Sequence, residues 1–567
     1  MKDYSQKKDS KFGMLIAAFI LLSGIVLSLF RHWEPSGEGQ LYWLFARIFS
    51  ETGDFVIMGR SPLYVLYLNI FRWLGYPQAI IAEYVVTSFI VTGSLVILLR
   101  KYIGLSWAVF AVLLWIPFFQ IGEPPVQKLG LACMCLAVAV RDQKLNRFRI
   151  ASSYALAAMA YMFRTAYLVF FLVLVAADAF RITKAESLKR FFAKLCPRKS
   201  DWPVFSVLII LFWFNFAQSP HHWNNGNGAT TTWFPSDGKS IANGAFIQGY
   251  NWHYIFYKYG TFENKDFYFT NQEVFNGAPD ALRATLANPK FVITQFTRNI
   301  KNTFCVIASL TELPPFLYKK YLKGFSYYFF LLFFTIPFAF VILYGALKAS
   351  RNRTMFLFIL SSALIIVGNS VIIAKARYMY PLVPIFLLSA FWYGRNIANF
   401  LGRKKIVSNL IIALLFLFLS PGFSAWSRIV KDGVEDINKS ELKIMERRDY
   451  SPRASFRQLE LLVEGCKGVL ALEHQFLGAF MDIPLNRVYD IWEIPPFGEF
   501  GNSSYDGLRP ERIDCLLISQ ALSTGTGCAT NHQIRYQNYI SPYAEYLKKK
   551  GAKVYNIKNF GKAIVLP

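Results

Sequence analysis

The chain has 567 residues, of which 54% are hydrophobic, 17% aromatic and only 17% charged, and its mean hydropathy is +0.31. Apolar side chains arranged in such long runs exceed what one soluble core can bury, which excludes a disordered, collagen-like or small disulfide-stapled protein. The net charge of +26 does not indicate a nucleic-acid partner, because the basic residues stand in short clusters between the apolar runs. We therefore expect a polytopic α-helical membrane protein whose partner is the lipid bilayer.

The apolar runs predict where the chain crosses the membrane. The first, 12–30, follows three lysines and has no small-residue cleavage site, so we expect an uncleaved span and not a signal peptide. The stretch 150–180 is too long for one span and carries Arg164 in its middle, which predicts two short spans that separate there. With the remaining runs, this gives about eleven spans. Those runs are 78–99, 105–121, 126–140, 203–217, 324–347, 355–374, 379–394 and 406–427.

Lysine and arginine in the short loops predict the orientation. With a cytoplasmic N-terminus, the inside segments hold 24 Lys and Arg against five Asp and Glu, as the positive-inside rule requires. The membrane part, 1–427, then has two large outer loops, at 31–77 and 218–323.

The tail, 428–567, is nearly neutral, with 19 Lys and Arg against 17 Asp and Glu, and we expect a soluble α/β domain outside the membrane. Two of its three cysteines, Cys466, Cys515 and Cys528, can form a disulfide there, and the pairing is open. Its strand-like runs are 468–472, 487–491, 513–519 and 553–557, and a helical stretch covers 536–550.

Acidic and basic residues follow the first span closely. Glu34 and Glu38 lie within eight residues of it, and Arg60 precedes the next apolar helix. Between them, the amphipathic stretch 41–49 is expected to lie in the membrane interface with its aromatic rings at headgroup level. A carboxylate and a guanidinium beside a membrane can take a proton from a nucleophile and hold a phosphate leaving group. The alternative is that both are solvated loop charges. Glu83, one turn into the second span, fits snorkelling or pairing as well as function.

Several short motifs occur in a fixed order. An acid after the first span is followed four residues later by a Tyr, then by Gly-Arg-Ser-Pro-Leu-Tyr at 59–64, Asn-Pro-Lys at 288–290 and Arg-Tyr-x-x-Pro-x-x-Pro at 377–384. This order resembles the GT-C glycosyltransferases, and among them the protein mannosyltransferases and the lipid A aminoarabinose transferase. The resemblance implies a GT-C-like fold with a large outer loop and an outer C-terminal domain.

The resemblance also implies residue roles. Glu38 stands where the family has its catalytic acid, with Glu34 as a rival because the usual acidic doublet is missing. Glu123 stands in the second outer loop, where a second acid is common, and it fits a helix-start charge equally well.

Three arginines are candidates for binding the donor phosphate. Arg60 and Arg377 match basic positions of the motifs, although Arg377 also fits an aromatic-belt anchor. Arg164 qualifies because an intramembrane arginine needs a cavity or a partner. The candidates for acceptor or sugar contact are Tyr42, Tyr64 and Tyr378.

The implied activity is transfer of a sugar from a polyprenyl-phosphate donor to an envelope acceptor, which is lipid A or lipopolysaccharide, another glycan or a protein. Transfer would take place on the outer face of the bacterial inner membrane, with the tail periplasmic, by inverting attack with an acidic general base. No cofactor is expected, since no Walker-type or dinucleotide glycine loop is present. Some family members bind a divalent cation, but the sparse outer acids favour no metal here.

Two other classes remain open. An O-antigen polymerase or ligase would share the many spans and the large loop, but would use loop Arg and His residues in place of an early acid. A lipid or polysaccharide transporter would show broken helices with polar residues at the bilayer midplane, and internal repeats.

Overall fold

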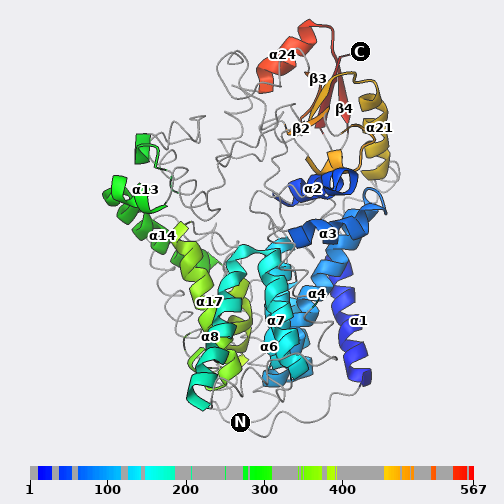
Figure 1. Ribbon diagram of the computed structural model, residues 1–567. Coiled ribbons are helices and arrows are strands. Elements are labelled where there is room, and N and C mark those ends of the chain that lie inside the picture. The colour runs from blue at the N-terminus through cyan, green and yellow to red at the C-terminus, as the bar shows by residue number, and fades with distance from the viewer. Residues whose placement is uncertain are drawn as a thin grey trace, which may run out of the picture.

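The computed structural model describes a helical bundle, two helices across one end of it, and a five-stranded sheet beyond them (Figure 1). One continuous apolar core runs through all three parts. The described residues are 11–28, 38–53, 62–116, 125–141, 147–185, 273–278, 281–309, 350–372, 380–389, 452–472, 475–484, 487–490, 513–518, 540–557 and 561–566, with a few single positions between them.

The bundle helices fall on apolar runs of the sequence. Among the described residues, α4 is the one helix that is long and apolar enough by itself to cross a membrane. α6 packs most extensively against α7 and α4. The count of about eleven spans stays a prediction. The bundle helices are α1 (Lys11–Ser28), α4 (Gln78–Ile103), α5 (Leu105–Trp115), α6 (Pro125–Arg141), α7 (Arg147–Phe163), α8 (Leu168–Ala185) and α17 (Arg353–Ile372).

The predicted break within the stretch 150–180 is confirmed. α7 ends at Phe163, a 3-10 turn covers Thr165–Tyr167, and α8 begins at Leu168. The Arg164 N–H still donates to the Ala160 carbonyl at 2.9 Å, and the Arg164 carbonyl accepts from the Tyr167 N–H at 2.9 Å. The chain therefore turns while these backbone groups stay hydrogen-bonded.

In the segment predicted as the large outer loop, α14 (Pro289–Ser309) follows α13 (Ala281–Ala287). Asn288 caps α14, since its Oδ1 accepts the Phe291 N–H at 3.2 Å. α14 is an amphipathic helix, because its buried positions recur at helical spacing. They are Val292, Gln295 and Asn299.

The helix after the first span, α2 (Glu38–Thr52), corrects one expectation. Residues 42–48 are exposed by 6% at most, so their aromatic rings are covered by protein and do not stand at headgroup level. α2 packs against α3 (Pro62–Arg72) and against the 3-10 turn η6 (Gln475–Ala479) of the tail. Figure 1 shows α2 between the bundle and the sheet. Because seven consecutive residues are buried, protein covers this part of the helix on every side and leaves no face of it for lipid.

Arg47 joins α2 to the tail. The side chain is 7% exposed and its Nε donates to the Glu51 carboxylate at 2.6 Å. Its two terminal nitrogens donate to three backbone carbonyl oxygens of the tail at 2.6–2.7 Å, those of Gly478, Met481 and Ile483. A buried guanidinium is tolerated because these acceptors replace the water that it loses.

The tail forms a mixed sheet in the order β2-β1-β3-β5-β4. β1 pairs in parallel with β2 and β3, and β5 pairs antiparallel with β3 and β4. The four predicted strands are confirmed, and α24 confirms the predicted helix over 541–549, whereas 536–539 lie outside the described residues. β5 and the helix α21 (Pro452–Glu464) were not foreseen. The domain boundary at 427/428 stays a prediction. The other elements are β1 (Val469–Leu472), β2 (Val488–Asp490), β3 (Ile513–Ile518), α24 (Ser541–Lys549), β4 (Lys553–Ile557) and β5 (Gly561–Val565).

A disulfide joins Cys466, just after α21, to Cys515 on β3, with their Cα atoms 6.2 Å apart. The disulfide therefore uses two of the three cysteines of the tail, whose pairing the sequence left open. The third, Cys528, lies outside the described residues.

Replacing Arg47 by Met is expected to weaken the attachment of η6 to α2 by about 3 kcal/mol, because three buried carbonyl oxygens lose their donor. Amide hydrogen exchange of residues 477–490 in the purified protein measures this effect. The control is Lys548→Met, which removes an exposed pair with Glu545 and should leave exchange unchanged. Equal exchange in Arg47→Met and the wild type would contradict the role given to Arg47.

The disulfide predicts a thiol-labelling pattern. In protein alkylated within cells and then denatured, Cys466 and Cys515 should react with a maleimide mass tag only after reduction. Cys466→Ser should leave Cys515 reactive without reduction and reduce stability by about 2–4 kcal/mol. Full labelling of both cysteines before reduction would show that the tail lies in a reducing compartment.

Candidate functional site

The structure brings together two of the candidate residues. The rings of Tyr42 on α2 and Tyr64 on α3 meet edge to face, with centroids 5.0 Å apart, and both residues are 1% exposed. Arg164 lies in the turn between α7 and α8 and is partly exposed. Glu38 is the first residue of α2, but its side chain lies outside the described part of the chain. Also outside it are Glu34, Arg60, Glu123, Arg377 and Tyr378, and the roles of all these candidates stay predictions.

A buried carboxylate, that of Glu83 on α4, lies beside these tyrosines. Its Oε1 accepts hydrogen bonds from the Thr87 hydroxyl at 2.7 Å and from the Tyr64 hydroxyl at 3.4 Å. The Tyr67 hydroxyl is 2.9 Å from that of Thr87. Burial, and after it the charge of Glu83, raises the pKa of the Tyr64 hydroxyl well above its usual range. Tyr64 therefore stays protonated and donates, and the carboxylate links α3 to α4.

Lys128, in the first turn of α6, supplies the opposite charge. It is 7% exposed, against 5% for Glu83, and it interacts electrostatically with that carboxylate. Each charge offsets part of the cost of burying the other. Glu83 is thus buried and hydrogen-bonded within the protein, and it does not snorkel. The sequence analysis did not single out Lys128, because one lysine beside an apolar run is common at the ends of membrane spans.

Tyr167 ties the turn after α7 to the start of α6. Its hydroxyl donates to the Gln127 carbonyl at 3.0 Å. Gly130 leaves room for the ring, since a Cβ there would lie 2.5 Å from Tyr167 Cε2. Arg164 and Tyr380 both interact electrostatically with Tyr167, so the turn, the start of α6 and the helix from residue 380 meet here.

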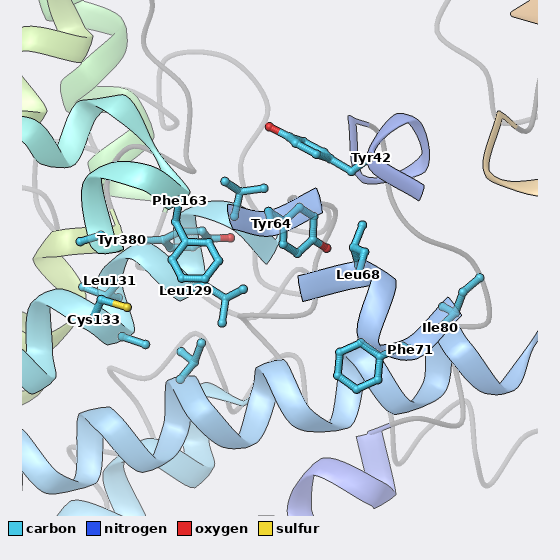
Figure 2. Close-up of a cluster of buried hydrophobic side chains, with 14 of the residues drawn as sticks. Tyr42, Tyr64, Leu68, Phe71, Ile80, Leu129, Leu131, Cys133, Phe163 and Tyr380 are labelled. Carbon is cyan, nitrogen blue, oxygen red and sulfur yellow. The ribbon is translucent and has the colours of Figure 1, made fainter. Parts of the chain in front are cut away.

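These polar groups converge at one end of the bundle. They come from the starts of α4 and α6, from the turn after α7 and from residue 380, all of which the loop charges predict to lie on the outer side. In Figure 2, Tyr42 and Tyr380 enter the cluster from different sides, with Tyr64 between them. The end of the bundle that lies against α2 therefore carries a carboxylate, two cations and several hydroxyls.

Metal binding has no support among the residues that can be described. No group of three or more His, Cys, Asp or Glu in this part of the chain is placed to hold an ion. Whether a divalent cation is used stays a prediction.

Comparison with solved structures gives several structural neighbours, and two of them are described below. No family model matches the chain, and no curated protein matches it significantly. The chain is similar to the archaeal oligosaccharyltransferase AglB of Archaeoglobus fulgidus, solved with an inhibitory peptide and a dolichol-phosphate, at 12% identity and a TM-score of 0.43, over 98% of this chain and 75% of that one. It is also similar to ArnT of Cupriavidus metallidurans, solved with undecaprenyl phosphate, at 11% identity and a TM-score of 0.33, over 97% and 96% of the two chains.

Both neighbours are GT-C membrane glycosyltransferases, the superfamily that the sequence motifs resemble. At this level of identity and of TM-score, the likeness assigns no residue roles.

Gly130→Ala is expected to displace the Tyr167 ring, because the added methyl group would overlap it, and to cost about 1–3 kcal/mol. Thermal unfolding of the detergent-purified protein measures the loss. Gly93→Ala on α4 is the matched control, since a Cβ there meets nothing within 4 Å and alanine favours a helix. Similar melting temperatures for the two variants would argue against a tight approach of Tyr167 to α6.

Proposed function

We propose that the protein is an integral membrane glycosyltransferase that moves a sugar from a polyprenyl-phosphate donor to an envelope acceptor on the outer face of the bacterial inner membrane. The observation that carries the proposal is the convergence of Glu83, Lys128, Arg164 and the tyrosine hydroxyls at the end of the bundle against α2. A lipid carrier within the membrane would present its phosphate and sugar at this end. Cations bind phosphate, and hydroxyls and carboxylates bind sugar hydroxyls.

In the proposed reaction, Glu38 is the general base. Its carboxylate takes the proton of an acceptor hydroxyl while that oxygen attacks the anomeric carbon. The bond from this carbon to the phosphate oxygen breaks on the opposite face, and polyprenyl phosphate leaves with the electron pair, so the configuration inverts. Glu34 and Glu123 are the alternative acids.

Phosphate binding is assigned to Arg60, with Arg377 or Arg164 beside it, because a guanidinium matches the geometry of phosphate oxygens. Contacts with the sugar or acceptor are assigned to Tyr42, Tyr64 and Tyr378. Glu38 is the first residue of α2, a position where a negative charge is favoured whatever its role.

The disulfide supports the proposed orientation. Cys466 and Cys515 pair in the tail, and structural disulfides persist in oxidising compartments such as the periplasm. We therefore place the tail in the periplasm and the N-terminus in the cytoplasm. The donor supplies its own activated bond, so no cofactor is assigned.

The test is mass spectrometry of envelope glycans and lipid A from cells with the wild-type protein, a deletion, or Glu38→Gln at matched expression. We expect both mutants to lose one sugar-sized mass and to accumulate a polyprenyl-phosphate sugar. The Glu38→Gln activity should fall by about 10²–10⁴-fold, as for loss of a general base.

Other outcomes would separate the alternatives. An altered deletion profile beside an unchanged Glu38→Gln profile would move the base to Glu34 or Glu123, or favour a polymerase or transporter. Unchanged profiles in both mutants would refute transfer to these acceptors.

A further inference from the structure

The first turn of α6 contains a buried amide that has no partner. Gln127 is 2% exposed, and within the described structure neither its Nε2 nor its Oε1 has a hydrogen-bond partner. A buried donor and acceptor left unsatisfied are destabilising, and an apolar side chain of the same size would avoid that cost. The amide is therefore left for a group that the described part of the chain does not supply.

The backbone of this turn is fixed from another side. Tyr167 donates to the Gln127 carbonyl at 3.0 Å, and it reaches that position because Gly130 has no Cβ. The bond occupies the main-chain carbonyl and leaves the side-chain amide without a partner. Hence the backbone of this turn is held in place, while the side-chain amide is enclosed by protein and has no hydrogen-bond partner in the described structure.

The surroundings of the amide define the chemistry of that ligand. The N–H groups in the first turn of a helix have no partner within the helix, and they place partial positive charge there. Lys128 is the next residue, and it also interacts with Glu83. Arg164 interacts with Tyr167, the residue that binds this turn. The positive charge would attract a phosphate, and the neutral amide beside it would hydrogen-bond a hydroxyl of the group that the phosphate carries.

We infer that Gln127 is a specificity-determining residue that hydrogen-bonds a hydroxyl group of the donor sugar, with Lys128 and the start of α6 beside the donor phosphate. An amide both donates and accepts, so it pairs with a neutral hydroxyl, whereas a charged sugar substituent would require a charged partner. The inference rests on the proposed function, because it takes the ligand to be a polyprenyl-phosphate sugar.

The experiment compares wild-type protein with Gln127→Leu, full length in detergent. The probes are undecaprenyl phosphate, bare or linked to glucose, galactose or mannose, and native mass spectrometry gives each affinity. The wild type should bind at least one sugar-bearing lipid roughly tenfold more tightly than the bare lipid. Gln127→Leu should lose that preference, bind bare undecaprenyl phosphate within about twofold of the wild type, and melt no lower without lipid, because no intramolecular bond is lost.

Gln295→Leu is the matched control. Gln295 on α14 is fully buried too, and its Oε1 also lacks a partner in the described structure, but its Nε2 donates to Asn299 Oδ1 at 2.8 Å. This substitution should lower the melting temperature and leave the sugar preference intact.

Three results would overturn the inference. They are an unchanged sugar preference in Gln127→Leu, a lower melting temperature of its lipid-free form, and equal affinity of the wild type for all four lipids. Failure of the proposed function looks different, because the wild type would then bind none of the undecaprenyl phosphates.

Discussion

The buried guanidinium of Arg47 holds the membrane part and the tail together. Three carbonyl oxygens of the tail and the carboxylate of Glu51 accept its hydrogen bonds. Aromatic contacts reinforce the joint, among them Trp43 with Phe480 at a centroid distance of 5.2 Å. Because α2 is fixed on the side of the tail and on the side of α3, its first residue has a defined place above the bundle. The candidate base and the tyrosine cluster thus depend on a contact that lies outside the candidate site.

Buried charges within the bundle are compensated at both of its ends. At the end against α2, Glu83 is hydrogen-bonded and interacts with Lys128. At the other end, Arg141 forms an ion pair with Asp178, which also accepts the Tyr154 hydroxyl at 2.8 Å. A charge in the apolar layer costs several kcal/mol without such partners. The second group needs no ligand to explain it, since its charges satisfy each other. The buried Gln127 amide differs, because no residue in the described part of the structure satisfies it.

The pattern of residues predicted elements well where the signal is local. Apolar runs predicted the bundle helices, and an arginine within a long apolar run predicted the break at Arg164. Strand-like runs in the tail predicted four of its strands. β5 was missed because its five residues begin Gly-Lys and are stabilised by pairing with β3 and β4. The lipid-facing role given to 41–49 was wrong, since an amphipathic helix looks the same whether lipid or a second protein layer covers it.

By itself, the sequence determined that the chain is a membrane protein, how its loop charges alternate, and which motifs resemble those of GT-C enzymes. Composition, periodicity and short spacings are local properties, so they need no knowledge of the fold. Only the tertiary structure decided which distant residues meet. Tyr42 lies against Tyr64, Glu83 interacts with Lys128, and Tyr167 contacts the turn of Gln127. These contacts depend on how helices far apart in the chain pack against one another, and packing is set by the fit of whole surfaces, which no single segment encodes.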